Sequence, residues 1–275
     1  MDQAADRGAD VRAVSVRGTA FNARIDGARA GAPWLTFSNS HATDIGLWDA
    51  QATLLSRDFR ILRYDTRGHG HTPPVPGPCD MAALAADVVG IWDALGIEAS
   101  HVVGLSLGGT TGLELAARYP GRVLSLAACD CRHTATDDFR AAWEPRIALA
   151  LDKGMAALVA PTVERWFTAA FHRKNPPELA RVREMIGATS VDGYVAGARA
   201  LQGIDAIDRL SAIRCPVLAL GGAFDPPAPP ALMADMAARI KGARHEVIAD
   251  AAHMSHLEQP VAFSRAIGEF LAAVA

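Results

Sequence analysis

A serine between glycines gives this chain its strongest chemical signal. Ser106 stands in Gly104-Leu-Ser-Leu-Gly108, after an apolar run at 101–105 that predicts a strand and before a segment at 107–119 that predicts a helix. A strand–turn–helix this sharp exposes the serine oxygen, and only glycine tolerates the close approaches two residues before and after it. The N-terminus of the following helix favours the negative charge that develops when the oxygen attacks an acyl carbon. The pattern therefore predicts a nucleophilic serine that performs acyl transfer.

A nucleophilic serine needs a histidine base, which we expect late in the chain, after the acid. His253 lies after a predicted strand at 245–248 and before the last predicted helix. A histidine in such a loop can reach back over the carboxyl ends of the strands. Of the nine histidines, only His253 and His256 lie in this loop, so His253 is the predicted base and His256 the alternative.

The acid that orients this base has two candidates. Asp225 comes just past a predicted strand at 215–220 and is the predicted triad acid. Asp130 follows the strand before it and is the alternative, because some hydrolases of this class place the acid there. Asp250 is close in sequence to the base, and we expect it only to shape the loop.

Two backbone amides are expected to hold the oxyanion. The first is the amide of Leu107, directly after the nucleophile. The second is the amide of His41, in the polar loop that follows a predicted strand at 34–37. The side chain of His41 either contacts substrate or is simply exposed, and the residues alone leave both interpretations open.

Basic and aromatic residues at the start of a helical region are candidates for substrate binding. Arg132, His133 and Arg146 cluster, together with Arg140, near the predicted mouth of the site. An arginine fork matches the geometry of a carboxylate, so one or more of them can pair with a small-molecule substrate that carries one. The alternative is that each is solvated on the outer face. Trp143 either lines the pocket or packs inside the helical region.

Alternating strands and helices must position these groups. The predicted strands are 11–16, 21–25, 34–37, 59–64, 101–105, 123–128, 215–220 and 245–248. Helical patterns between most of them predict an α/β fold, with a mostly parallel eight-stranded sheet flanked by helices. Only helical patterns follow the sixth strand. We therefore expect residues 1–131 and 206–275 to form the core, and residues 132–205 to form a helical cap over its active edge.

The composition argues against several other classes of function. The chain has 275 residues with 27 basic and 30 acidic side chains, a formal net charge of −3, so no nucleic-acid partner is expected. No apolar run approaches the roughly 20 residues of a membrane helix, and the N-terminal segment lacks the apolar part of a secretory signal. The four cysteines lack zinc spacing and are predicted to be free thiols, with no bound metal. These features predict a cytoplasmic protein. The sequence leaves the oligomeric state open between a monomer and a homodimer.

Six motifs spread over the chain point to one family. They are Ser38-Asn-Ser40, Thr43-Asp-Ile-Gly-Leu-Trp48-Asp, Phe59-Arg-Ile-Leu-Arg-Tyr-Asp-Thr-Arg-Gly-His-Gly-His71, Gly104-Leu-Ser-Leu-Gly-Gly109, Glu164-Arg-Trp-Phe-Thr168 and Ala252-His253. Together they resemble the 3-oxoadipate enol-lactonase family. This resemblance covers most of the chain and implies an α/β-hydrolase fold with a helical cap, no cofactor, and opening of a small carboxylated enol-lactone. It also implies the catalytic roles given above to Ser106, Asp225 and His253.

The chain departs from that family at two segments beside the predicted pocket. The family's oxyanion loop reads Ser-Asn-Ser-Leu-Gly, whereas this one ends in His41-Ala42. After the sixth strand, the family pattern resembles Cys-Asn-Thr-Ala, and here the segment is Ala128-Cys-Asp-Cys-Arg132. We predict a serine hydrolase that opens a small lactone or carboxylic ester. The alternatives are a carboxylesterase of other specificity, a carbon–carbon bond hydrolase, a cofactor-free perhydrolase and a hydrolase-like ligand receptor.

Overall fold

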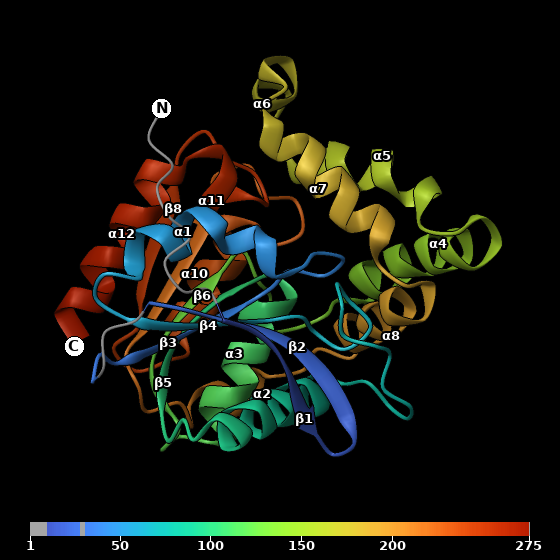
Figure 1. The fold of residues 1–275 in the computed structure, drawn as a ribbon. Helices are drawn as coiled ribbons and strands as arrows, with labels where there is room; N and C mark the ends of the chain where they lie inside the picture. Colours follow the sequence, from blue (N-terminus) through green and yellow to red (C-terminus); the bar gives the residue numbers. More distant parts are fainter. Residues whose placement is uncertain (1–9, 28–30, 275) are drawn as a thin grey trace, which may run out of the picture.

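One twisted sheet forms the centre of the molecule. The structure is a computed structural model that describes residues 10–27 and 31–274. The strands in these ranges are β1 (Asp10–Val16), β2 (Thr19–Asp26), β3 (Trp34–Ser38), β4 (Arg60–Tyr64), β5 (Ser100–Leu105), β6 (Val123–Cys129), β7 (Val217–Gly222) and β8 (Arg244–Ile248). They lie in the order β1-β2-β4-β3-β5-β6-β7-β8 (Figure 1). The strand β2 runs antiparallel to β1 and β4, and the other neighbours are parallel. The predicted eight-stranded, mostly parallel sheet is confirmed.

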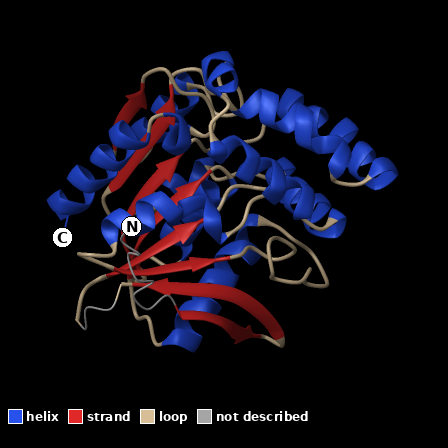
Figure 2. Ribbon diagram, turned by 45° about the horizontal axis from the view of Figure 1, so that its top comes forward, coloured by secondary structure: helices blue, strands red, loops and turns tan. Residues whose placement is uncertain are grey.

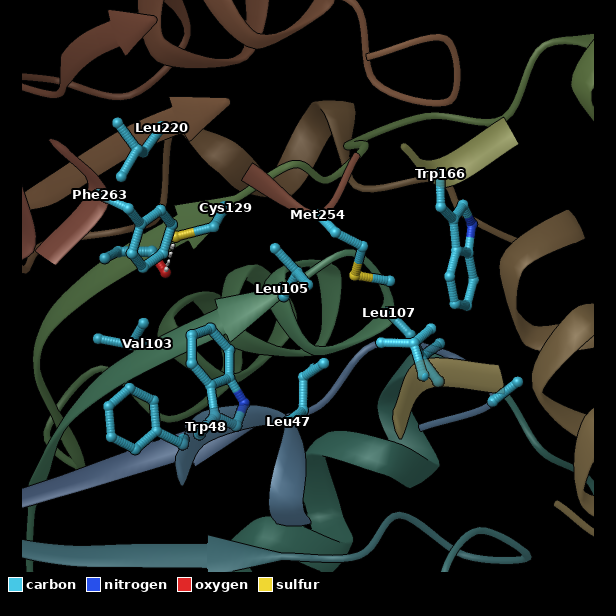
Figure 3. Packing of buried hydrophobic residues seen from close by; sticks show 14 of the residues in the cluster. Leu47, Trp48, Val103, Leu105, Leu107, Cys129, Trp166, Leu220, Met254 and Phe263 are labelled. Atoms are coloured by element: carbon cyan, nitrogen blue, oxygen red, sulfur yellow. Dashed lines mark hydrogen bonds between the residues drawn. The ribbon is translucent and has the colours of Figure 1, made fainter. Parts of the chain in front are cut away.

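Helices cover both faces of the parallel strands, which explains why these strands read as continuous apolar runs. The helices concerned are α1 (Asp49–Leu55), α2 (Met81–Leu95), α3 (Leu107–Arg118), α10 (Pro230–Ala238) and α12 (Pro260–Val274). In β5, Val102 packs in a cluster with residues of α2, α3 and α10. The next residue, Val103, points to the opposite face and packs with residues of α1 and α12. Figure 3 shows this second cluster, with Trp48 and Phe263 beside Val103.

The stretch between β6 and β7, all of it described, is helical and forms its own layer beyond the sheet (Figures 1 and 2). Its helices are α4 (Asp137–Lys153), α5 (Ala156–Trp166), α6 (Ala169–Lys174), α7 (Pro177–Ala188) and α8 (Val191–Gln202). Thr134 and Asp205 form an isolated antiparallel bridge, so the two ends of this insertion lie side by side. A short helix, α9 (Ile207–Leu210), then leads back toward β7. Below, α4–α8 are called the cap.

The sequence pattern does not predict four short helical segments. They are the 3₁₀ helix η1 (Ile45–Trp48), the helices α1 and α9, and the helix α11 (Ser255–Glu258). Each has four to seven residues, which is too short to display a hydrophobic period. Two of them border the predicted site: η1 follows the oxyanion loop, and α11 follows the loop of His253.

No helix in the described ranges has both the length and the apolar character that crossing a bilayer requires. The four cysteines are free: Cys129 and Cys131 are buried, and Cys79 and Cys215 are partly buried. The prediction of free thiols is confirmed. Cys129 packs in the sheet cluster of Figure 3, where it behaves as a small apolar side chain.

Candidate active site

Ser106 lies at the tip of the turn between β5 and α3. Its φ of 55° and ψ of −113° are unfavourable for a residue with a side chain. A Cβ at Gly104 would come within 2.3 Å of the carbonyl oxygen of Gly108, and a Cβ at Gly108 within 2.2 Å of that of Ser38. Backbone packing therefore requires both glycines, as the sequence indicated. The strained turn holds the serine at the carboxyl end of β5.

Three side chains from three different strand ends form one hydrogen-bonded chain. The Oγ of Ser106 lies 3.0 Å from Nε2 of His253, and Nδ1 of His253 lies 2.9 Å from Oδ2 of Asp225. Because a carboxylate only accepts, Nδ1 of the neutral imidazole carries the proton and the Nε2 lone pair faces the serine hydroxyl. His253 and Asp225 are buried, so water does not compete for their hydrogen bond. The parallel sheet thus brings together the three residues that the sequence predicted for catalysis.

The alternative acid, Asp130, is held elsewhere. Its Oδ1 accepts a hydrogen bond from the amide of Gly222 at 2.8 Å, and its Oδ2 accepts one from the hydroxyl of Ser255 at 2.6 Å. Burial, followed by the nearby Asp225 carboxylate, raises the pKa of Asp130 well above its usual value. Asp130 therefore connects β7 to α11, whereas Asp225 contacts the imidazole.

The alternative base, His256, is a core residue. Its ring packs against Trp48 and Phe263, with centroid distances of 4.9 and 5.7 Å. Burial lowers its pKa to about 3, so it is neutral at physiological pH. Asp250 is exposed at the turn after β8, and its backbone carbonyl accepts a hydrogen bond from Gln259. Neither His256 nor Asp250 joins the chain of hydrogen bonds at Ser106.

A buried glutamate that the sequence analysis did not single out ties the histidine loop to the cap. The Oε1 of Glu258 accepts a hydrogen bond at 2.7 Å from the amide of Ala252, the residue before His253. Its Oε2 accepts hydrogen bonds from the amide and the hydroxyl of Thr168, at 3.0 and 2.6 Å. Thr168 lies between α5 and α6, so one carboxylate fixes the loop of the base and the cap against each other.

A cavity of about 220 Å³ lies next to Ser106, between the sheet edge and the cap. Of the predicted substrate-binding residues, Arg132, Trp143 and Arg146 line this cavity. His133 does not line it. The imidazole of His133 is buried, with Nε2 3.0 Å from Oδ2 of Asp235 in α10. The prediction that His133 contacts substrate is therefore wrong: its side chain turns toward α10.

A third arginine of the cavity, Arg165, was not predicted from the sequence. It lines the cavity from α5, and its Nη1 donates a long hydrogen bond, 3.3 Å, to the carbonyl of Pro161. Burial, and then the nearby Arg146 cation, lower the pKa of Arg165 to about 10, and burial lowers the pKa of Arg146. Within the described residues, neither Arg146 nor Arg165 has a carboxylate at ion-pair distance. Two partly desolvated cations without a counter-ion favour an anionic ligand. The sequence signal was weak: Arg165 only precedes the apolar stripe that begins at Trp166.

The other two arginines of the predicted cluster have partners in the protein. Arg132 donates from Nε to the carbonyl of Thr134 at 3.1 Å and from Nη1 to the carbonyl of Pro227, and its guanidinium lies over the ring of Phe139. It therefore supports the cavity wall. Arg140 is exposed, pairs with Asp137 and does not line the cavity.

The two predicted oxyanion amides flank the serine turn. Leu107 begins α3 directly after Ser106, and His41 follows β3 in the loop against which the turn packs. Among the described residues, neither amide donates to a backbone or side-chain acceptor. The His41 side chain is buried, at 2% exposure, and lines the cavity, so the interpretation of an exposed side chain is wrong.

No group of three or more potential metal ligands comes together in the described part of the chain. His69, one of the two histidines on the glycine-rich turn after β4, is buried. Its Nδ1 lies 2.9 Å from the carbonyl oxygen of Arg67, and its Nε2 lies 3.2 Å from Nδ1 of His41. His71 is exposed.

Comparisons with known proteins agree with this geometry. The sequence model of the alpha/beta hydrolase fold family matches residues 37–260. The chain is 33% identical over 259 residues to 3-oxoadipate enol-lactonase 1 of Acinetobacter baylyi. The matched region covers 94% of this chain and 95% of that protein. The crystal structure of the enol-lactonase from Burkholderia xenovorans LB400 gives a TM-score of 0.90 at 39% identity, covering 94% and 98% of the two chains. A thermophilic esterase from Thermogutta terrifontis, solved with malate bound, gives 0.86 at 29% identity, covering 98% and 99%. The resemblance seen in the sequence is confirmed, and the chain belongs to the alpha/beta hydrolase fold family.

Proposed function

We propose that this chain is a serine hydrolase that opens a small carboxylated lactone or carboxylic ester, most like a 3-oxoadipate enol-lactonase. The observation that carries the proposal is the hydrogen-bonded chain of Ser106, His253 and Asp225 beside a cavity. The names of the enol-lactonase relatives, at 33% and 39% identity over most of the chain, support the lactone specificity.

The proposed reaction proceeds through an acyl-enzyme on Ser106. The Nε2 of His253 takes the hydroxyl proton as the serine oxygen attacks the substrate carbonyl. His253 then gives this proton to the leaving oxygen when the ester bond breaks. A water molecule, deprotonated by the same nitrogen, attacks the acyl carbon. The bond to the Oγ of Ser106 then breaks, and Nε2 of His253 returns the proton to that oxygen. Asp225 holds the imidazole in the tautomer that can accept the proton, and stabilises the imidazolium that forms.

The amides of His41 and Leu107 serve as the proposed oxyanion donors. Both belong to the backbone around the serine turn, and neither has another acceptor among the described residues. Donors that are fixed before the reaction need no reorganisation as charge develops, and the loss of one costs roughly 10²–10³ in rate.

Arg146 and Arg165, on α4 and α5 of the cap, form the proposed carboxylate site. We assign residues 132–205, which include the cap and its two flanking segments, to one helical domain. The two guanidiniums line the same cavity as Ser106 and have no ion-pair partner in the described part of the protein. A substrate carboxylate would supply the missing negative charge while the acyl group lies at the serine. The cap would then select the substrate, and the sheet edge would carry out the reaction.

Steady-state hydrolysis by the wild type beside Ser106→Ala tests the proposal. The panel comprises the carboxylated enol-lactone, γ-butyrolactone and short p-nitrophenyl esters. We expect the enol-lactone to turn over fastest, and the variant to lose at least roughly 10⁴-fold in kcat. Turnover that survives in Ser106→Ala would exclude the acyl-enzyme. A vinylogous diketone is tested separately, and a dienol chromophore formed from it would instead support carbon–carbon bond hydrolysis.

A further inference from the structure

Two histidines in the cavity wall form a hydrogen-bonded relay whose proton positions follow from the geometry. The Nδ1 of His69 lies 2.9 Å from the carbonyl oxygen of Arg67, which only accepts, so Nδ1 carries a proton. In the neutral ring the Nε2 of His69 is then an acceptor, and it lies 3.2 Å from Nδ1 of His41. The Nδ1 of His41 must therefore donate, and its Nε2 keeps a lone pair.

The surroundings keep both rings neutral. Burial lowers the pKa of His69 to about 4 and, together with His69 and Arg165, lowers the pKa of His41 well below its usual value. The ring of His41 is fixed by Tyr194, at a centroid distance of 4.6 Å, and by close contact with Gly197 in α8. The His41 ring is therefore held in one orientation and one tautomer.

The hydrogen-bonded pair of histidines ends at an acceptor, Nε2 of His41, that receives no hydrogen bond from the described residues. This nitrogen is buried. The Nε1–H of Trp143, whose ring lies edge-on to His41 at 5.5 Å, is a buried donor with no acceptor among the described residues. Both residues line the cavity beside Ser106. Unsatisfied buried polar atoms are rare and costly, and here an acceptor and a donor stand on neighbouring rings.

We propose that His41 Nε2 and Trp143 Nε1 form a subsite for a hydroxyl group of the substrate. A hydroxyl can donate to His41 and accept from Trp143 at the same time, whereas a carboxylate, ether or ester oxygen has no proton for His41. The preferred lactone or ester therefore carries a hydroxyl close to its reacting carbonyl. His69 acts as a positioning residue, since its lone pair fixes the tautomer of His41. This inference rests on the proposed hydrolase function and narrows its substrate class.

Matched lactones test the subsite at pH 7.5. The kcat/KM values of γ-butyrolactone, α-hydroxy-γ-butyrolactone and β-hydroxy-γ-butyrolactone are compared in the wild type, His41→Leu, Trp143→Phe and the control Leu201→Met. We expect the wild type to favour one hydroxylactone over the parent lactone by roughly tenfold or more. His41→Leu should bring this ratio close to one, and Trp143→Phe should lower it. Leu201 also lines the cavity, and Leu201→Met, which changes the wall without removing a polar atom, should preserve the ratio. A wild type with no preference, or a ratio unchanged in His41→Leu, overturns the subsite.

Nitrogen-15 NMR of the imidazole rings gives a readout that does not require turnover. In Ser106→Ala protein we expect His41 to be protonated at Nδ1, and its Nε2 resonance to shift on titration with the preferred hydroxylactone but not with γ-butyrolactone. In His69→Leu, His41 should lose this fixed tautomer, whereas His69→Gln should retain it, because the amide oxygen can accept from Nδ1. A proton on Nε2 of His41 in the parent protein, or equal shifts with both lactones, overturns the subsite. If no lactone is opened but these shifts occur, the proposed hydrolysis fails and the hydroxyl subsite stands.

Discussion

The edge of the sheet and the cap place their functional residues by different means. Ser106, Asp225 and His253 each lie within a few residues of a strand end, where the backbone of the parallel sheet leaves little freedom. Arg146 and Arg165 instead lie on two cap helices, α4 and α5, and reach the cavity only because those helices pack at a particular angle. The positions of Ser106, Asp225 and His253 therefore follow from local sequence, whereas those of the two arginines depend on tertiary packing.

This difference suggests a division of labour. In the proposed reaction, the fixed hydrogen bonds of Ser106, His253 and Asp225 at the sheet edge govern the chemical step. The cap supplies charge and shape around the substrate, which should govern binding. Substitutions at the edge are therefore expected to lower kcat, and substitutions in the cap to raise KM.

The largest expected effect distinguishes the aspartates at the sheet edge. Asp225→Asn should lower kcat by roughly 10⁴-fold, because an amide that donates to Nδ1 would favour the wrong tautomer of His253. Asp130→Asn should lower kcat far less, since Asp130 contacts Gly222 and Ser255 rather than the imidazole. Steady-state kinetics with the enol-lactone measures both, with exposed Asp250→Asn as the control. Equal losses for Asp225→Asn and Asp130→Asn would contradict the assignment of the acid.

The next effect tests the cap. Arg165→Gln and Arg146→Gln should each raise KM for a carboxylated lactone by about 10- to 100-fold, as expected for losing a charge-assisted hydrogen bond, with little change in kcat. For neutral γ-butyrolactone the KM should not rise. Arg140→Gln is the matched control, because Arg140 is exposed and outside the cavity. A KM that rises equally for both lactones would mean that these arginines shape the cap rather than bind a carboxylate.

The same contrast explains what the sequence could predict. The strand pattern and the turn glycines Gly104 and Gly108 follow from local rules, so the sheet and the residues that meet at Ser106 could be anticipated. Asp225 and Asp130 could not be ranked firmly, because each follows a neighbouring strand. The choice between the two aspartates required the positions of Gly222 and Ser255, which lie 92 and 125 residues away from Asp130 in the sequence.

Cap residues resist prediction because side-chain direction depends on how the helices meet. Arg132, Arg146 and Arg165 all line the cavity, yet Arg132 donates to loop carbonyls and the other two lack a partner. His133 follows Arg132 directly and points to α10. Nothing in the spacing of these residues distinguishes them. The role of Glu258 was not predicted for the same reason, since it depends on a contact with Thr168, 90 residues away.

A smaller effect concerns the junction between the two regions. Glu258→Gln should lower the free energy of unfolding by about 1–3 kcal/mol, because an amide cannot accept from both Ala252 and Thr168 with its NH₂ end. It should also lower kcat several-fold by loosening the loop of His253. Urea unfolding and steady-state kinetics measure the two effects, and exposed Glu164→Gln in the cap serves as the control. If Glu258→Gln matched the control in both, the cap and the base would not be coupled through this carboxylate.

The effect expected to be smallest at neutral pH separates two histidines three residues apart, one at the site and one in the core. His256 has a pKa of about 3 in the fold, because of its burial, whereas a histidine in the unfolded chain has a pKa of about 6.5. Between these values the unfolded state binds a proton that the folded state does not, so stability should fall as the pH decreases below about 6.5. His256→Leu should remove this dependence, and make the slope of unfolding free energy shallower by up to about 1.4 kcal/mol per pH unit between pH 6 and 4.

Urea unfolding of the parent and His256→Leu proteins at several pH values measures this slope. At pH 8 neither state of the parent protonates the imidazole, so the difference between the two proteins there reports the change in packing against Trp48 and Phe263 alone. Subtracting that difference leaves the contribution of proton binding by His256 to the free energy of unfolding. Parallel curves from pH 8 to pH 4 would show that His256 is protonated to the same extent folded and unfolded. The core around Trp48 and Phe263 would then tolerate an imidazolium, and the burial of His256 would not keep its ring neutral.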